Sequence, residues 1–145
     1  MNRLIFLKIL LILFLMPHNL MAFNQNIFDD AKIYFEKKDY DQSKFLFQKF
    51  LVYNPKDYLS YLYLAKIYKE EDNQNETKKN LDTTLLLDPK NEEALYMLID
   101  IKLERSNFTE VKELQKRFEI ACNSLCEKKD SIEKRLKNFE TNNES

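Results

Sequence analysis

Pro55 and Pro89 are separated by an interval of 89 − 55 = 34, and the chain of 145 residues contains no glycine. Proline cannot continue a helix, and it pushes the residue before it out of the α region. Each proline therefore marks the end of a helical segment, at Asn54 and at Asp88. Tight hairpin turns depend on glycine for positive φ, so the lack of glycine argues against β-hairpins. Together these features predict an all-helical chain that is divided at a fixed period.

The same period runs through most of the chain without an insertion. Repeats over 24–57, 58–91 and 92–123 place large and small residues at matching positions. In each repeat, positions 4, 7, 8 and 11 form one face of a first helix, and positions 20, 24 and 27 one face of a second. The small residues at positions 8 and 20 let the two backbones approach closely. The best-matched positions hold Ile27, Ala31, Tyr34, Tyr40, Ser43 and Phe47 in the first repeat and Tyr61, Leu64, Ala65, Tyr68, Thr77 and Leu81 in the second.

This residue pattern resembles that of the tetratricopeptide-repeat family, whose unit is a helix–turn–helix of about 34 residues. The strings KKDYDQS and RSNFTEV fall at the same point of the first and third repeats. The resemblance covers Asn24 to about Asn123 and implies an all-α solenoid of about three units. The third repeat departs from the pattern, with Ile99 where a small residue is usual, Lys102 where tyrosine is usual, and no closing proline.

The residues after the third repeat predict a capping helix over 124–140. Its apolar stripe consists of Leu125, Ile132, Leu136 and Phe139. A repeat stack leaves its last unit with an exposed apolar side, and a helix with a polar back covers that side. Docking of the stripe on a partner is the alternative. The final residues, 141–145, are expected to be disordered.

Residues 1–22 have the layout of a secretory signal peptide. Arg3 lies near the start, an apolar run over 4–16 is broken only by Lys8, and Ala22 stands at the expected cleavage site. The run is shorter than the roughly 20 residues of a membrane-spanning helix. Cleavage would leave an exported protein of 145 − 22 = 123 residues in the periplasm or cell envelope. The alternative is an uncleaved segment that anchors the chain to the membrane.

Two cysteines, Cys122 and Cys126, lie at the turn into the capping helix. An even pair in an exported protein suggests a disulfide, provided that the turn brings the Cβ atoms to about 4 Å. The sequence leaves open whether the two are bridged. Two cysteines without a histidine do not make a zinc site.

The sequence also argues against several kinds of chemistry. The only histidine, His18, belongs to the predicted leader, so the mature chain has no imidazole for a catalytic triad or a metal. A chain without glycine has no phosphate-binding loop of the usual kinds. Acidic pairs such as Glu92 and Glu93 fall at helix ends, where solubility explains them. The mature chain carries 23 − 2 = 21 basic residues against 24 acidic ones, which does not favour nucleic acid. We therefore expect a non-catalytic protein without cofactor or metal.

The resemblance implies a concave groove lined by the first helices of the repeats. The positions that face it correspond to Phe28, Lys32, Phe35, Leu59, Leu62, Tyr63, Lys66, Lys69, Tyr96, Met97, Asp100 and Leu103. Apolar and aromatic residues with several lysines suit an extended or helical peptide that carries some negative charge. The family's clamp for chaperone tails is not predicted, because Phe28 and Tyr63 occupy two of its places. A flanking segment or a second copy of the chain could instead cover the groove.

The sequence thus predicts an exported, non-catalytic adaptor or scaffold that binds a peptide or partner protein. The string YFEKKDYDQSKFLFQKFLVYNPKD is also similar to repeats in periplasmic proteins of outer-membrane β-barrel assembly and of the Tol–Pal system. That similarity implies a role in outer-membrane assembly or envelope integrity. A membrane-tethered structural subunit that retains its N-terminal segment is a further alternative.

Overall fold

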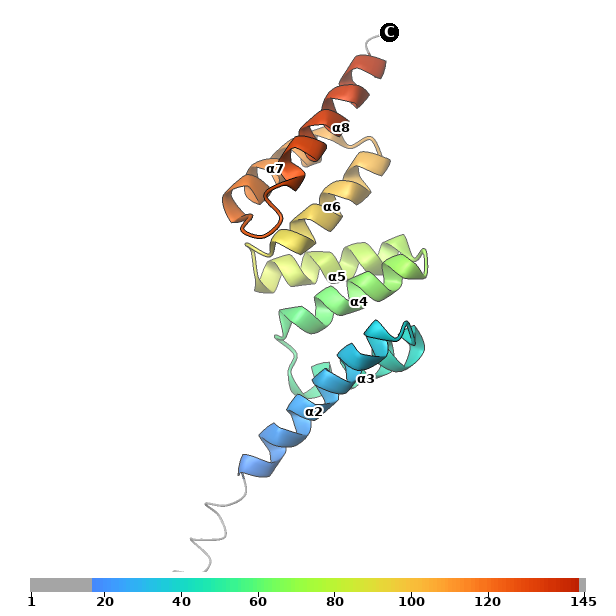
Figure 1. Cartoon of the computed structure of the whole chain (residues 1–145), viewed down its shortest axis with the longest axis vertical. Coiled ribbons are helices and arrows are strands. Elements are labelled where there is room, and N and C mark those ends of the chain that lie inside the picture. The colour runs from blue at the N-terminus through green and yellow to red at the C-terminus, as the bar shows by residue number, and fades with distance from the viewer. Residues whose placement is uncertain (1–16, 144–145) are drawn as a thin grey trace, which may run out of the picture. The chain divides into compact units, whose positions relative to one another are not determined.

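The computed structural model describes residues 17–143, which form seven α-helices and no strand. The chain divides into two compact modules, an N-terminal module that ends at Pro55 and a C-terminal module that begins at Lys56. The N-terminal module contains α2 (Pro17–Glu36) and α3 (Tyr40–Tyr53). The C-terminal module contains α4 (Tyr58–Glu70), α5 (Gln74–Leu87), α6 (Glu92–Glu104), α7 (Phe108–Ala121) and α8 (Lys128–Asn143) (Figure 1). Most of the predicted leader lies outside the described residues. Within residues 17–143, no helix is both long and apolar enough to cross a membrane.

The turn between the two helices of each repeat has the same backbone geometry. Lys38, Asp72 and Ser106, which recur at the repeat period, have φ values of 59°, 55° and 54°. Three residues after the end of each first helix, an amide donates back to a carbonyl five residues earlier, from Asp39 to Tyr34, from Asn73 to Tyr68 and from Asn107 to Lys102. This is the hydrogen-bond pattern of a Schellman C-cap, where glycine is the usual left-handed residue. The chain makes the same turn three times without glycine.

The residue after each left-handed position caps the second helix. Asp39, Asn73 and Asn107 each accept a hydrogen bond from the amide three residues later. The first helices α4 and α6 are capped in the same way by Asp57 and Asn91. A side-chain N-cap of this kind contributes about 1 kcal/mol to helix stability. The period seen in the sequence is therefore also a period of helix starts.

The second helices end at residues that are again one period apart, namely Asn54, Asp88 and Cys122. Pro55 and Pro89 follow the first two of these ends and lie outside the helices. The predicted role of the prolines and the predicted all-α repeat fold are confirmed.

The N-terminal module has a small aromatic core. The ring of Phe28 lies 5.6 Å from that of Phe47 and 5.3 Å from that of Phe50. Ala31 and Ser43 are fully buried, and the Ser43 hydroxyl donates to the Ala31 carbonyl at 2.9 Å. The two small residues at positions 8 and 20 thus meet where α2 and α3 approach each other closely.

The C-terminal module has one continuous apolar core to which all five of its helices contribute. Its fully buried members include Ala65, Leu81, Leu95, Ile99, Val111, Phe118 and Ile132. Ile132 and Leu136 bring α8 into this core, so α8 covers the end of the third repeat. A helix one period after α6 would begin near residue 126, and α8 occupies that register.

The ends of α8 differ from the expected range of 124–140. The helix begins at Lys128 because the preceding residues form a turn that is held by hydrogen bonds to Glu92. It continues to Asn143, so residues 141–143 are helical and the prediction of a disordered tail is wrong for them. No proline or glycine is present after Lys128 to end the helix earlier. Residues 144–145 lie outside the described part.

Candidate partner-binding site

An ion pair joins the first helices of the second and third repeats. Lys66 of α4 places its Nζ 2.7 Å from Oε1 of Glu93 on α6. The same ammonium lies 5.0 Å from the centre of the Tyr63 ring, one turn earlier on α4. Lys66 is therefore held between an acid and the face of an aromatic ring, an arrangement that fixes both helices at this surface.

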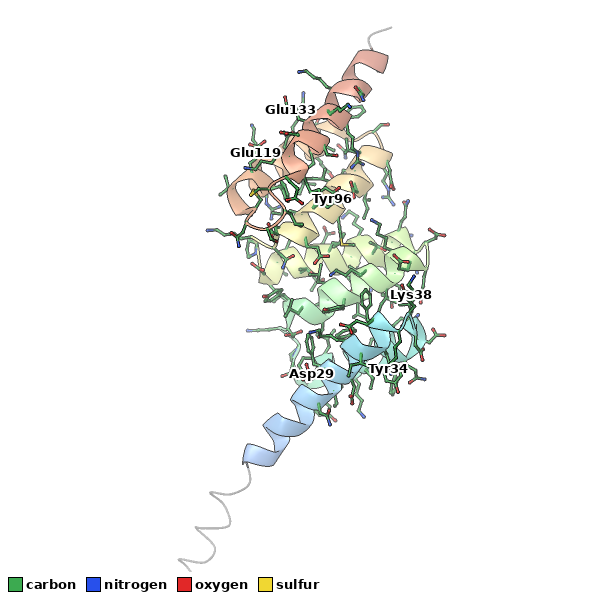
Figure 2. The ribbon with its side chains drawn as sticks, in the orientation of Figure 1. Asp29, Tyr34, Lys38, Tyr96, Glu119 and Glu133 are labelled. Atoms are coloured by element: carbon green, nitrogen blue, oxygen red, sulfur yellow. A yellow bond between two sulfur atoms is a disulfide. The ribbon has the colours of Figure 1, made fainter. Side chains whose placement is uncertain are left out.

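Tyr96 lies one turn beyond Glu93 on α6 (Figure 2) and is partly buried against the core. Its ring packs against the buried ring of Phe118 at a centroid distance of 6.1 Å. We call Tyr63, Lys66, Glu93 and Tyr96 the α4–α6 cluster. It presents two aromatic rings, one on each helix, on either side of a bound ion pair.

A small hollow of about 130 Å³ lies near the end of α4. Its lining consists of Lys69, Asp72, Gln74, Thr77, Asp100, Ile101 and Glu104. Lys69 is exposed and stands one turn after Lys66. Asp100, on the opposite side, is paired with Arg135 of α8. The hollow therefore has one exposed cation and three carboxylates, one of them already neutralised by the capping helix.

Six of the twelve predicted groove residues lie on α4 and α6 and are partly or fully exposed, namely Leu59, Tyr63, Lys66, Lys69, Tyr96 and Asp100. Leu59 is half-buried and packs against the core of the C-terminal module. In the N-terminal module, Lys32 and Phe35 are half-buried, and the Phe35 ring lies 5.9 Å from that of Tyr40. That these residues bind a partner stays a prediction.

Four of the predicted groove residues, Phe28, Leu62, Met97 and Leu103, are buried. They belong to the cores of the modules and not to an accessible surface, which corrects the prediction. The positions concerned border the face that packs on neighbouring helices. A long apolar side chain at such a border turns inward, since burial favours it by about 1.5–3 kcal/mol.

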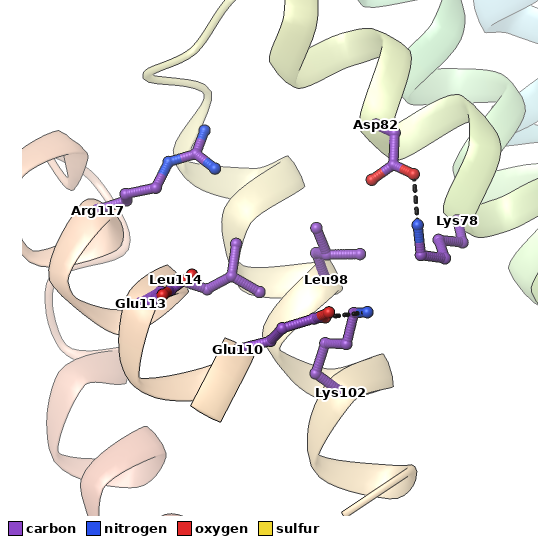
Figure 3. A pocket seen from close by; sticks show the side chains of 8 residues that line it. All are labelled: Lys78, Asp82, Leu98, Lys102, Glu110, Glu113, Leu114 and Arg117. Carbon is purple, nitrogen blue, oxygen red and sulfur yellow. Dashed lines mark hydrogen bonds and ion pairs between the residues drawn. The ribbon is translucent and has the colours of Figure 1, made fainter. Parts of the chain in front are cut away.

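A second hollow, of about 300 Å³, lies between α5, α6 and α7 and was not predicted (Figure 3). Its floor contains Leu98 and Leu114, and charged residues surround them. Lys102 pairs with Glu110 across the hollow, and that hydrogen bond is the main cause that lowers the pKa of the Glu110 carboxyl. The sequence contained one signal for this hollow, because Lys102 stands where the family usually has a tyrosine ring.

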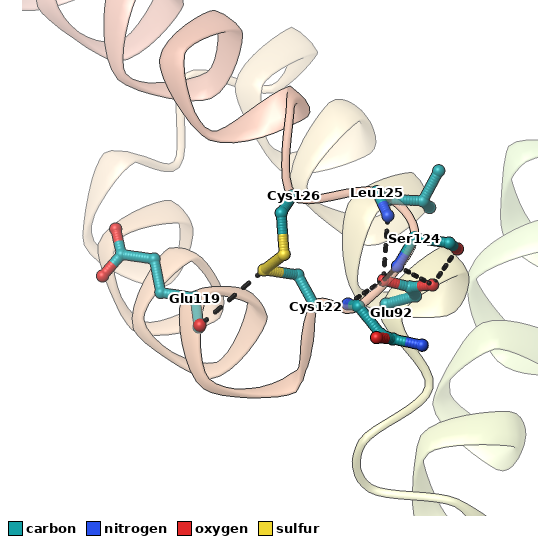
Figure 4. Close-up of a disulfide and its surroundings, with 7 residues drawn as sticks. Glu92, Glu119, Cys122, Ser124, Leu125 and Cys126 are labelled. Carbon is teal, nitrogen blue, oxygen red and sulfur yellow. Dashed lines mark hydrogen bonds between the residues drawn. A yellow bond between two sulfur atoms is a disulfide. The ribbon is translucent and has the colours of Figure 1, made fainter.

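Cys122 and Cys126 are joined by a disulfide, with their Cα atoms 5.2 Å apart (Figure 4). Cys122 occupies the position at which the first two repeats have Asn54 and Asp88. The bridge closes the turn between α7 and α8. Asn123, the next residue, stands where the other two repeats have a proline.

Glu92, the first residue of α6, holds the same turn. Its carboxylate accepts hydrogen bonds from the amides of Asn123, Ser124 and Leu125 and from the Ser124 hydroxyl (Figure 4). Partial desolvation raises the pKa of this carboxyl, but these hydrogen bonds outweigh it and lower the pKa to about 2. The expectation that Glu92 and Glu93 serve only solubility is therefore wrong, because each carboxylate has a specific structural partner.

The part of the chain that the structure describes contains no group of three or more histidine, cysteine or acidic residues arranged to hold a metal ion. No protein-family model matches the sequence, and the search of curated proteins finds no similar sequence.

Several solved structures are similar to this chain. The type III secretion chaperone SycD of Yersinia enterocolitica, solved with a peptide of the translocator YopD, aligns with a TM-score of 0.69 at 12% identity, over 82% of this chain and 93% of SycD. The Sgt2 TPR domain from Aspergillus fumigatus aligns with a TM-score of 0.69 at 13% identity, over 84% and 82% of the two chains. The first TPR domain of Spaghetti (RPAP3), bound to the HSP90 peptide SRMEEVD, aligns with a TM-score of 0.65 at 13% identity, over 84% and 96%. The chain has the fold of a tetratricopeptide-repeat domain.

Proposed function

We propose that this protein is an adaptor that binds a peptide or a segment of a partner protein at the α4–α6 cluster. The observation that carries the proposal is the Lys66–Glu93 pair, which joins the first helices of two successive repeats and sets Tyr63 and Tyr96 on either side. Similar folds with bound peptides support it, namely SycD with a YopD peptide and the RPAP3 domain with an HSP90 peptide.

The two tyrosines supply apolar ring area and hydroxyl groups, a combination that is common at the centre of protein interfaces. Lys66 and Lys69 lie one turn apart on α4 and add positive charge. A ligand carboxylate at Lys66 competes with Glu93, whereas one at Lys69 meets an exposed ammonium. We therefore infer a ligand that combines an apolar or aromatic residue with at least one acidic residue.

Photo-crosslinking tests the binding surface directly. A photoreactive phenylalanine in place of Tyr63 or Tyr96 should crosslink a partner in intact cells, and mass spectrometry of the product identifies it. The same amino acid at Glu113, on the exposed side of α7, is the matched control. Equal crosslinking at all three positions, or none at the two tyrosines, rejects the α4–α6 cluster as the site.

A charge exchange separates binding from folding. Lys66→Glu alone breaks the ion pair, whereas Lys66→Glu combined with Glu93→Lys restores it with the charges reversed. We expect both variants to lose at least tenfold in affinity for an acidic ligand, with helicity by circular dichroism retained in the double variant. Unchanged affinity in the double variant would show that the ligand does not depend on the positive charge of Lys66.

We also propose that the protein is exported and acts in the bacterial cell envelope. Two features support export, the leader-like segment over 1–22 and the Cys122–Cys126 disulfide. Disulfides persist in oxidising compartments and are rare in the cytosol. Mass spectrometry of the mature N-terminus tests this: Phe23 as the first residue supports a cleaved leader, and an intact Met1 supports the membrane-tethered alternative.

A further inference from the structure

One ion pair connects the candidate binding surface to the C-terminal helix. Asp100 lies on the face of α6 that carries Glu93 and Tyr96, because four and seven residues are about one and two helical turns. Its carboxylate is paired with the guanidinium of Arg135 on α8, a helix that packs against α6 and α7 (Figure 1). The face of α6 that bears the α4–α6 cluster therefore also bears a charge that is compensated from α8.

The carboxylate of Asp100 depends on this compensation. The side chain of Asp100 is only 17% exposed, and that of Arg135 is 35% exposed. A carboxylate that is mostly removed from water is unfavourable unless an opposite charge or hydrogen-bond donors accompany it. Among the described residues, Arg135 is the cation that forms a salt bridge with Asp100. Removal of the guanidinium would therefore leave an uncompensated negative charge at this surface.

Asp100 also lines the small hollow at the end of α4, where Lys69 is the cation of the described lining. Asp72 and Glu104 contribute two further carboxylates to that lining. Without Arg135, three carboxylates would surround the Lys69 ammonium and repel an acidic group that approaches it. With Arg135 in place, one of the three is neutralised. The charge that a ligand meets at this hollow is therefore set in part by α8.

The position of Arg135 is fixed by contacts that hold α8 independently of the ion pair. Ile132, one turn before Arg135, is fully buried in the core, and Leu136, the next residue, is buried as well. The disulfide between Cys122 and Cys126 closes the turn that leads into the helix. The guanidinium is therefore presented to α6 by a helix that has its own anchors, and its charge can be altered while the helix stays in place.

We propose that α8 is part of the partner-binding surface and that Arg135 determines the preference of this surface for acidic ligands. This inference rests on the proposed function of the α4–α6 cluster. Arg135 acts through Asp100, because it compensates that carboxylate and so leaves the positive charge of Lys69 available to an acidic group of the ligand. The capping helix thus covers the apolar end of the third repeat and also adjusts the charge of the binding site.

Two peptide mixtures test this role. A photoreactive phenylalanine replaces Tyr63 in the full chain, and the probes are fluorescent heptapeptides that all contain a phenylalanine. One mixture has two fixed aspartates, and the other has two asparagines in their place. The ratio of the two crosslinking yields, acidic over neutral, measures the preference for acidic ligands. We expect a ratio above one, and a ratio about threefold lower for Arg135→Gln, because one uncompensated charge is added near Lys69.

Three further variants separate the charge of Arg135 from its packing. Arg135→Lys should retain most of the ratio. Arg135→Gln combined with Asp100→Asn should restore it, because the carboxylate that needs compensation is then absent. Lys116→Gln, which removes a positive charge from the exposed side of α7, is the matched control and should leave the ratio unchanged. Displacement of α8 alone would lower both yields and leave their ratio unchanged.

The inference and the proposed function fail in different ways. A ratio of one before any substitution at Arg135, a ratio that Arg135→Gln does not change, or an equal change in Lys116→Gln overturns the inference. The proposed function is decided separately by the crosslinking in cells at Tyr63 and Tyr96, which uses no acidic probe. A chain that captures its partner in cells while the ratio stays constant keeps the proposed function and rejects the role of Arg135.

Discussion

The second and third repeats share one geometry but end in different ways. The second repeat ends in Asp88 and Pro89, so the backbone itself stops the helix. The third has no proline at this point, and the Cys122–Cys126 bridge and the Glu92 carboxylate hold its last turn. The third repeat is thus closed by a short disulfide loop and by a carboxylate 31 residues before Asn123, whereas the second is closed by its own backbone.

This difference explains how a degenerate repeat can keep the fold. Ile99 stands where Ala65 provides the close approach in the second repeat, yet both are fully buried. Lys102 replaces the ring of Tyr68 and pairs with Glu110. The third repeat also has α8 on its open side, through Ile132 and Leu136. Its departures from the pattern are offset by tertiary contacts, which makes this end of the protein more sensitive to single substitutions.

The largest loss of stability is expected when the apolar side chain that anchors α8 in the core is removed. Ile132→Ala should lower the free energy of unfolding by about 2–4 kcal/mol, because the side chain is fully buried and its loss leaves a cavity. Urea unfolding followed by circular dichroism measures the effect. Ser131→Ala, at the exposed neighbour, is the control and should change stability by less than about 0.5 kcal/mol. Equal effects for both variants would show that α8 is not part of the core.

Loss of the disulfide between Cys122 and Cys126 should give the next largest decrease in stability. Replacing Cys122 and Cys126 together by serine should cost about 2 kcal/mol, the chain-entropy value for so short a loop. Reduction of the native protein by dithiothreitol should lower its unfolding midpoint by a similar amount. The double variant is the control, since a reductant should leave it unchanged. A native protein that does not respond to the reductant would show that the bridge does not stabilise this end.

Loss of the Glu92 contacts should be smaller and should depend on pH. Glu92→Gln should cost about 1 kcal/mol at neutral pH, because the carboxylate is partly solvent-exposed. The folded pKa of about 2 lies below the ordinary value of 4.5, so the stabilisation is complete above about pH 4.5 and is lost as the pH falls toward 2. Unfolding curves of both proteins across this range measure the difference. Glu113→Gln, whose carboxylate accepts none of these hydrogen bonds, is the control.

The smallest effect concerns the turn that the two repeats share. Ser106→Gly should stabilise the protein by about 0.5–1 kcal/mol, since serine at a φ of 54° is strained and glycine is not. Asp72→Gly should give less, because aspartate tolerates the left-handed region better. Thermal unfolding of the two variants measures both effects. A loss of stability in both would mean that the added freedom of the unfolded chain outweighs the relief of strain.

Much of the fold could be predicted because its signals are local. The prolines end helices through their own stereochemistry, and Ala31 and Ser43 mark the close approach of α2 and α3 by their size alone. The candidate site was less predictable. Tyr63 and Lys66 lie where the repeat pattern places them, but Leu62 and Met97 turn into the core. The repeat position predicts which side of the helix a residue lies on only to within one residue. Which of two neighbouring residues is buried depends on the packing of the surrounding helices.

The amino-acid sequence by itself determined that this chain is helical, that its helices pair, and that the pairs recur at a fixed period. Those properties follow from sterics and periodicity, which act on neighbours along the chain. Only the tertiary structure decided that Lys66 pairs with Glu93, that Lys102 lines a hollow together with Glu110, and that Glu92 holds the turn between α7 and α8. The residues next to a carboxylate in the sequence do not indicate which group it will contact, because that contact depends on the packing of helices that are distant in sequence.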